Sequence, residues 1–137
     1  MTYGSNSLIQ KYQDQAISTM SNGERIVRLY DEIIKNLKYA SILLKKGDSA
    51  NAQKCMKKSR NILNYLTVIL DGKYPLSDTL KKLYTYMAGE LINAEATGDV
   101  SHIETILPQV EELRDAWAEA EKQVRANSIG KPNQAGK

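Results

Sequence analysis

The sequence predicts an all-α protein, an antiparallel up-down four-helix bundle with a short additional N-terminal amphipathic segment. Helix-forming residues dominate the 137-residue chain, Pro occurs only 3 times, and apolar residues recur at intervals of three and four. No run of alternating apolar and polar residues indicates a strand. A chain of this length fits one domain with a core of its own.

The first long helix is predicted to begin at Ser21-Asn-Gly-Glu24, a capping-box pattern in which the serine accepts a backbone N–H bond. Its apolar residues keep helical spacing as far as Leu44, and Gly47-Asp48 is typical of a helix end. A second helix is expected to start at Asp48 or Ser49 and to end at Asp71-Gly72.

Ser77 is predicted to cap a third helix that ends at Gly98-Asp99. Ser101-His-Ile-Glu104 has the spacing of another capping box and is expected to open the fourth helix. Pro108 should kink or restart that helix, because it lacks a donor and clashes with the carbonyl four residues before it. The short connections favour antiparallel neighbours.

Three regions follow from this pattern. Residues 21–126 form the helical bundle, and residues 127–137 are expected to be a disordered tail because they have nothing to bury. In residues 1–20, Leu8, Tyr12, Ala16 and Met20 lie four apart. This spacing predicts a partly mobile amphipathic strap against the bundle.

The sequence shows no arrangement of reactive side chains that is typical of an enzyme. His102 is the only histidine and is predicted to be a solvated side chain, while Cys55 lies on an apolar stripe, where cysteine acts as a small hydrophobe. The sequence contains no phosphate-binding loop and no nucleophile elbow. We therefore predict no catalytic residue, no cofactor and no metal, and the lone thiol favours the cytosol.

Charge and hydropathy limit the classes of partner that this chain is expected to bind. The net charge of +3 is too small and too dispersed for a nucleic-acid reader, and the sequence shows neither a signal peptide nor a membrane-spanning run. Residues 45–82 hold nine basic and three acidic side chains, whereas residues 90–121 hold nine acidic and one basic. These blocks either pair as ordinary surface charges or leave a basic face for an acidic partner.

The first long helix is more apolar than one core stripe requires, with 12 apolar residues of 19 between Ile26 and Leu44. Neighbouring helices and the strap can cover this surplus, or it can form a groove for the amphipathic helix of a partner. The 8 tyrosines and absence of Phe favour the groove, because tyrosine offers rigid contact area with a polar end.

Several fragments occur together in an order that resembles the flagellar secretion chaperone family, over about residues 8–122. They are Tyr12, Ala16-Ile-Ser-Thr, Ile26-Val-Arg-Leu-Tyr-Asp31, Lys58-Ser-Arg-Asn-Ile62, Leu66, Leu83-Tyr-Thr-Tyr86 and Leu113-Arg-Asp-Ala-Trp117. The chain departs from the family at Glu32, where a glycine is usual, and at Gly89-Glu90, where arginines are usual.

The resemblance implies a cytosolic chaperone that binds the C-terminal segment of flagellin, prevents premature polymerisation and delivers it to the flagellar type III export gate. The family's N-terminal segment can cover part of the flagellin groove. The predicted flagellin-binding residues are Tyr12, Ile17, Tyr30, Asn61, Tyr65, Leu66, Tyr84, Tyr86 and Leu91. Tyr30 and Tyr84 have core packing as an equal alternative, whereas Tyr65 and Tyr86 fall off the main apolar stripes.

Three other functions compete with the chaperone, and the weakest of them is an unrecognised enzyme, which only a loss of activity on mutation of a specific polar group would support. A structural or regulatory bundle would use its apolar face to self-associate, and a homodimer is left open. An adaptor for nucleic acid or an acidic partner would use the basic residues from the end of the first helix into the second, namely Lys45, Lys46, Lys54, Lys57, Lys58 and Arg60.

Overall fold

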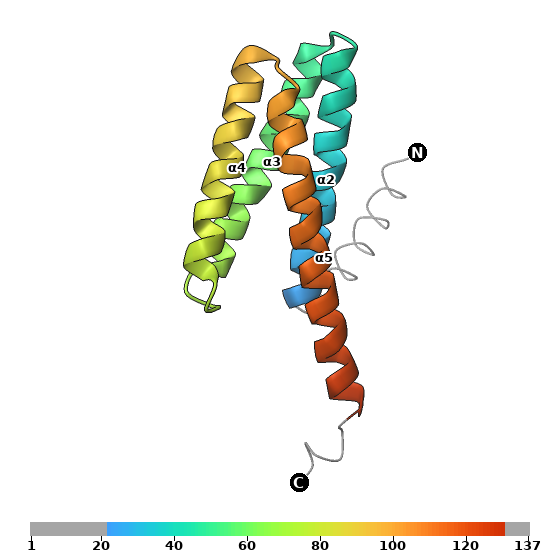
Figure 1. The fold of residues 1–137 in the computed structure, drawn as a ribbon, viewed down its shortest axis with the longest axis vertical. Helices are drawn as coiled ribbons and strands as arrows, with labels where there is room; N and C mark the ends of the chain where they lie inside the picture. The colour runs from blue at the N-terminus through green and yellow to red at the C-terminus, as the bar shows by residue number, and fades with distance from the viewer. Residues whose placement is uncertain (1–21, 131–137) are drawn as a thin grey trace, which may run out of the picture.

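The computed structural model describes the backbone of residues 22–130 and the side chains of residues 22–126. This part of the chain forms four helices, α2 (Asn22–Lys45), α3 (Ser49–Leu70), α4 (Ser77–Thr97) and α5 (Ser101–Gly130), which run alternately up and down (Figure 1). Each helix packs on its neighbours in the chain, and α5 closes the ring against α2. The predicted all-α bundle is confirmed.

Glycines end two of the helices as predicted. Gly47 follows α2 with a φ of 81°, and Gly98 ends α4 with a φ of 72°, a backbone region that glycine enters without a Cβ clash. Asp48 caps α3 through its carboxylate, which accepts a hydrogen bond from the backbone N–H of Asn51 at 3.2 Å. Hydrogen bonds from Asn51 hold the pKa of Asp48 below its ordinary value.

Two predicted serine caps are wrong. Ser77 is the first residue of α4, and its hydroxyl donates to the Leu70 carbonyl and accepts from the Tyr74 N–H, which closes the turn after α3. At the start of α5, the Glu104 N–H bonds to the Val100 carbonyl instead of to a serine hydroxyl. Both serines fit the capping pattern in sequence, but each is already the first residue of its helix and therefore does not take the cap position before it.

Helix α5 does not restart at Pro108 but continues through it to Gly130. The helix thus extends beyond residue 126, where the predicted bundle ended, and includes the first residues predicted as a disordered tail. The capping residue Ser21, the strap at 1–20 and the tail at 131–137 lie outside the described residues.

The core fills the centre of the bundle along its length. It is formed by aliphatic side chains, two methionines and two tyrosines: Ile26, Tyr30, Ile33, Leu37, Ala40, Ala52, Met56, Leu63, Leu66, Leu70, Leu80, Tyr84, Met87, Leu91, Ala94, Ile103, Ile106 and Val110. Tyr30 on α2 and Tyr84 on α4 hydrogen-bond through their hydroxyls, with ring centroids 6.4 Å apart. This contact joins two helices that face each other diagonally.

No helix among residues 22–130 has the length and apolarity needed to cross a membrane.

Candidate functional site

The bundle opens at the end where α2 begins, because α4 and α5 diverge towards it (Figure 1). A groove of about 720 Å³ lies there, between the turn after α3, the start of α4 and the second half of α5. We call it the α4–α5 groove; it is lined mainly by apolar residues, namely Gly23, Tyr74, Pro75, Leu76, Leu80, Leu113, Ala116, Trp117, Ala120, Glu121 and Val124. Its size and apolar character are typical of a binding site.

Aromatic and aliphatic side chains from different elements form this groove. Tyr74, in the turn, meets Trp117, on α5, edge to face with ring centroids 5.4 Å apart. Leu76 is 64% exposed and Val124 is 62% exposed. Leu113, Trp117, Ala120 and Val124 follow helical spacing on α5. Leu113 and Trp117 are partly buried against the core, whereas Ala120 and Val124 are exposed, so no described helix covers the outer part of this apolar stripe.

In this half of α5, polar contacts join the helix to α2. Arg114 donates to Asp31 at 2.7 Å, and Arg125 lies 2.7 Å from Glu24. Hydrogen bonding and the charge of Asp31 raise the pKa of Arg114 above its ordinary value. This half of α5 therefore contacts α2 on one side and has exposed apolar residues on the other.

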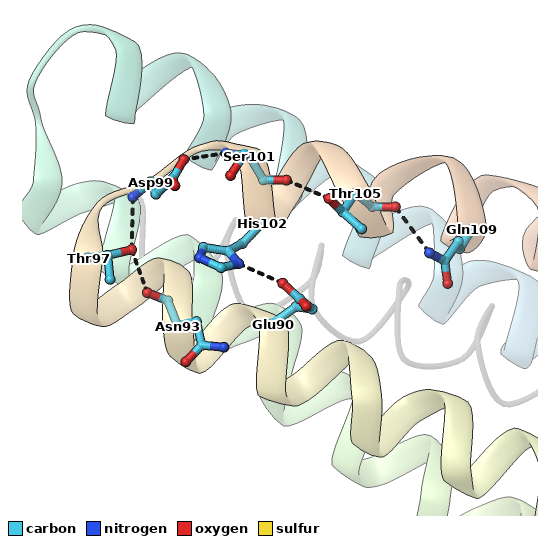
Figure 2. Close-up of polar contacts among 8 residues, drawn as sticks. All are labelled: Glu90, Asn93, Thr97, Asp99, Ser101, His102, Thr105 and Gln109. Atoms are coloured by element: carbon cyan, nitrogen blue, oxygen red, sulfur yellow. Dashed lines mark hydrogen bonds and ion pairs between the residues drawn. The ribbon is translucent and has the colours of Figure 1, made fainter.

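The opposite end of the bundle is closed by polar contacts between α4 and α5 (Figure 2). His102 Nδ1 lies 2.6 Å from Glu90 Oε2, with both side chains half-buried. Asp99 accepts from the Ser101 N–H at 2.9 Å, which lowers the pKa of Asp99. The prediction that His102 is solvated is wrong, because the turn brings Glu90 within reach across the two helices.

A second groove, of about 360 Å³, lies between the start of α2 and the end of α3. We call it the α2–α3 groove; its lining combines apolar and basic residues, namely Asn22, Arg25, Ile26, Arg28, Leu29, Tyr65, Ile69, Leu70, Lys73 and Tyr74. Tyr74 lines both grooves, so they adjoin at the open end of the bundle.

The comparisons with known proteins agree with this architecture. The family model described as "Flagellar protein FliS" matches residues 5–124, most of the chain. The chain belongs to the FliS family.

Two curated members of the FliS family are similar along nearly their whole length. The flagellar secretion chaperone FliS of Bacillus subtilis (strain 168) is 26% identical over 119 residues, covering 87% of this chain and 90% of the relative. The protein of the same name from Escherichia coli (strain K12) is 28% identical over 120 residues, covering 85% of this chain and 88% of the relative. A solved structure titled "Crystal structure of flagellar chaperone from bacteria" has a TM-score of 0.70 at 21% identity, covering 87% and 98% of the two chains, and shows the shared fold.

The residues predicted to bind flagellin separate into three groups in this FliS-family bundle. Asn61, Tyr65 and Tyr86 are exposed on α3 and α4, and Tyr65 lines the α2–α3 groove. The fully buried group is Tyr30, Leu66, Tyr84 and Leu91. Tyr12 and Ile17 lie outside the described residues. Only the exposed group can meet a partner directly without a change in the bundle.

Burial explains the position of Tyr30 and Tyr84. It raises the pKa of both hydroxyls above the ordinary value of 10.0, because the charged form would lose its water. At Tyr30 the neighbouring Tyr84 raises the pKa further. The pair is thus neutral, and its two polar groups satisfy each other inside the core.

The two departures from the family pattern make contacts within the bundle. Glu90 is bound by His102, as described above. Glu32 lies 3.2 Å from Lys35, and its backbone carbonyl accepts from the buried amide of Asn36 at 2.8 Å. Neither residue therefore presents an unpaired charge on a partner surface.

The basic and acidic blocks pair only in part. Arg60 donates two hydrogen bonds to Glu95, at 2.6 and 2.9 Å, which raises the pKa of Arg60, and Lys45 lies 3.7 Å from Glu104. By contrast, Lys57 and Lys58 form no ion pair with a described residue. Among the residues described, no group of three His, Cys, Asp or Glu could hold a metal ion, and Cys55 packs half-buried against the core.

Sequence reasoning missed the principal groove residues Tyr74, Leu76, Leu80 and Val124. Their signal was weak, because Tyr74 and Leu76 lie in a turn, whereas Leu80 and Val124 keep the helical spacing that is typical of core residues. Leu76 beside Pro75 was the visible clue, since an apolar residue in a short turn has no core to enter.

Proposed function

We propose that this member of the FliS family is a cytosolic chaperone that binds the C-terminal segment of flagellin, prevents premature polymerisation and delivers it to the flagellar type III export gate. It acts by binding and carries out no reaction of its own. The observation that supports this proposal is the apolar α4–α5 groove beside the uncovered stripe of α5. The curated relatives are named as flagellar secretion chaperones, which makes a flagellar protein the natural client.

An amphipathic helix is the ligand that this groove fits best. A client helix would place apolar side chains on Leu76, Leu80 and Trp117 and keep its polar face in water. Folding on binding costs several kcal/mol in ordering, so the client needs a long contact surface to offset it. The adjoining α2–α3 groove, with the exposed Tyr65, extends the surface around the open end.

The test is a titration of a flagellin C-terminal peptide of about 40 residues, from the same organism, followed by calorimetry and by circular dichroism. One-to-one binding with a gain in helix is expected. Leu76→Glu and Val124→Glu should each weaken binding at least about tenfold, because a carboxylate in the apolar groove loses its water on contact.

Ile92→Glu is the matched control. Ile92 is 53% exposed on α4 and lines neither groove, so the same change there should leave the peptide affinity within about twofold. Absence of peptide binding by the folded, monodisperse protein would refute the proposal. A mass that rises with concentration would then favour self-association through the apolar face.

A further inference from the structure

The α2–α3 groove differs in charge from the α4–α5 groove. Arg25, Arg28 and Lys73 surround an apolar floor, and no carboxylate lines it. In the α4–α5 groove the one charged lining residue is Glu121. The two adjoining grooves therefore select for different side chains, and the α2–α3 groove favours an anion next to apolar groups.

The charge of Arg28 is not used inside the described bundle. Glu24 and Asp31 lie one helical turn away from it on α2, but Arg125 and Arg114, both on α5, bind these carboxylates at 2.7 Å. Arg28 itself forms no ion pair with a residue in 22–126, and neither does Lys73 across the groove. The two exposed cations both line the α2–α3 groove, whose lining contains no carboxylate. Arg28 also borders a shallower depression on the α5 side of α2, which Glu24, Asp31 and Glu121 line.

The floor of the groove supplies the apolar part of a binding site. Leu29 and Ile69 are half-buried against the core, and Tyr65 is 55% exposed beside them. A volume of about 360 Å³ accepts a few side chains at a time, not a folded domain. A peptide segment is therefore the size of ligand that fits.

We propose that the α2–α3 groove binds an acidic stretch of the client, in which Asp or Glu side chains meet Arg28 and Lys73 while neighbouring apolar side chains pack on Leu29, Tyr65 and Ile69. This inference rests on the proposed function and adds a charge requirement to it. The occupant is the client segment itself, and the groove sets the chemistry of that segment: cations beside an apolar floor favour carboxylates next to apolar side chains. A client that lacks acidic residues at this contact binds more weakly.

The test uses the full-length chain and the same flagellin peptide, titrated at about 50 and about 300 mM salt. Arg28→Glu and Lys73→Glu are expected to weaken binding about tenfold or more at low salt, and the difference should shrink at high salt. Lys57→Glu is the matched control, because it makes the same charge change on exposed α3 outside both grooves, and it should cost no more than about twofold.

Charge exchange then shows whether the contact is direct. Acidic residues of the peptide are replaced by Lys one at a time, and at least one replacement should weaken binding to the unaltered chain yet restore binding to Arg28→Glu. Equal losses for Arg28→Glu and Lys57→Glu, or no loss for Arg28→Glu and Lys73→Glu, would overturn the inference. The proposed function would survive that result as long as Leu76→Glu still weakens binding, whereas a peptide that fails to bind the unaltered chain would refute both.

Two other occupants give different results. If the chain's own residues 1–21 fill the groove, Asp14, their only acidic residue, is the partner, and both Asp14→Lys and Arg28→Glu should tighten peptide binding. If a second copy fills it, Arg28→Glu should lower the mass measured by light scattering. Either result overturns the inference.

Discussion

The hydroxyls of Tyr30 and Tyr84 hydrogen-bond to each other inside the core. Because both residues are almost completely buried, water cannot serve as a hydrogen-bond partner for either hydroxyl. An unpaired polar group in such a place costs about 1–3 kcal/mol, more than the hydrogen bond itself contributes. The pair also connects α2 with α4 across the centre of the bundle. These two tyrosines are thus structural, although the sequence offered partner binding as an equal alternative.

Tyr30→Phe should lower the free energy of unfolding by about 1–3 kcal/mol, because the Tyr84 hydroxyl is left buried without its partner. Urea unfolding measures this change. The double variant Tyr30→Phe/Tyr84→Phe should recover part of the loss, since neither polar group is then left alone. Tyr65→Phe, at an exposed position, is the control and should change the free energy of unfolding by less than about 0.5 kcal/mol. If Tyr30→Phe changed the free energy of unfolding no more than Tyr65→Phe does, the prediction would be contradicted.

Helix α5 makes the polar contacts at the closed end of the bundle and carries the exposed apolar residues at the open end. Its first turns are held by His102 and Glu90, and its second half is held by Arg114 and Arg125 on one side only. Pro108 lies between these two parts, where it removes one backbone hydrogen bond from a continuous helix.

Pro108→Ala should raise the free energy of unfolding by about 1–3 kcal/mol, because alanine restores the missing donor and removes the clash with the preceding turn. Pro108 is exposed, so the change creates no cavity. Thermal unfolding followed by circular dichroism measures the shift, with Glu112→Ala as the control on exposed α5. A less stable Pro108→Ala variant would show that the packing of α5 depends on the proline.

For the whole molecule, the raised pKa values of Tyr30 and Tyr84 make stability depend on alkaline pH. Above about pH 10 the unfolded chain loses these protons while the folded chain keeps them, so the unfolded state binds fewer protons. The free energy of unfolding should therefore be unaffected by this pair below about pH 10 and fall above it, by up to about 1.4 kcal/mol per pH unit for each tyrosine.

Urea unfolding between about pH 8 and about pH 11 tests this dependence. The variant Tyr30→Phe/Tyr84→Phe serves as the reference, because it lacks both groups and keeps the lysines. Its stability should decline less steeply over the same range. Identical pH profiles for the two proteins would rule out the tyrosine pair as the cause.

Local signals predicted the helices well and their caps poorly. The spacing of apolar residues and the glycines at 47 and 98 located the helices and their ends, because both act through the backbone nearby. The capping roles of Ser77 and Ser101 were mispredicted, since a hydroxyl bonds whichever backbone group the turn brings to it. The flagellin-binding residues stay a prediction; the structure shows that Tyr65 and Tyr86 are exposed and that Leu66 and Leu91 are buried.

The sequence alone determined the all-α class, the antiparallel order of the helices and the resemblance to the flagellar secretion chaperones, because these depend on spacing and residue type along the chain. Only the tertiary structure decided which apolar side chains lie inside. Tyr30 and Tyr84 belong to the core, whereas Leu76, Trp117 and Val124 line a groove, since exposure depends on how far α4 and α5 diverge. The pairing of His102 with Glu90 also needed the fold, because it joins side chains that local spacing does not connect.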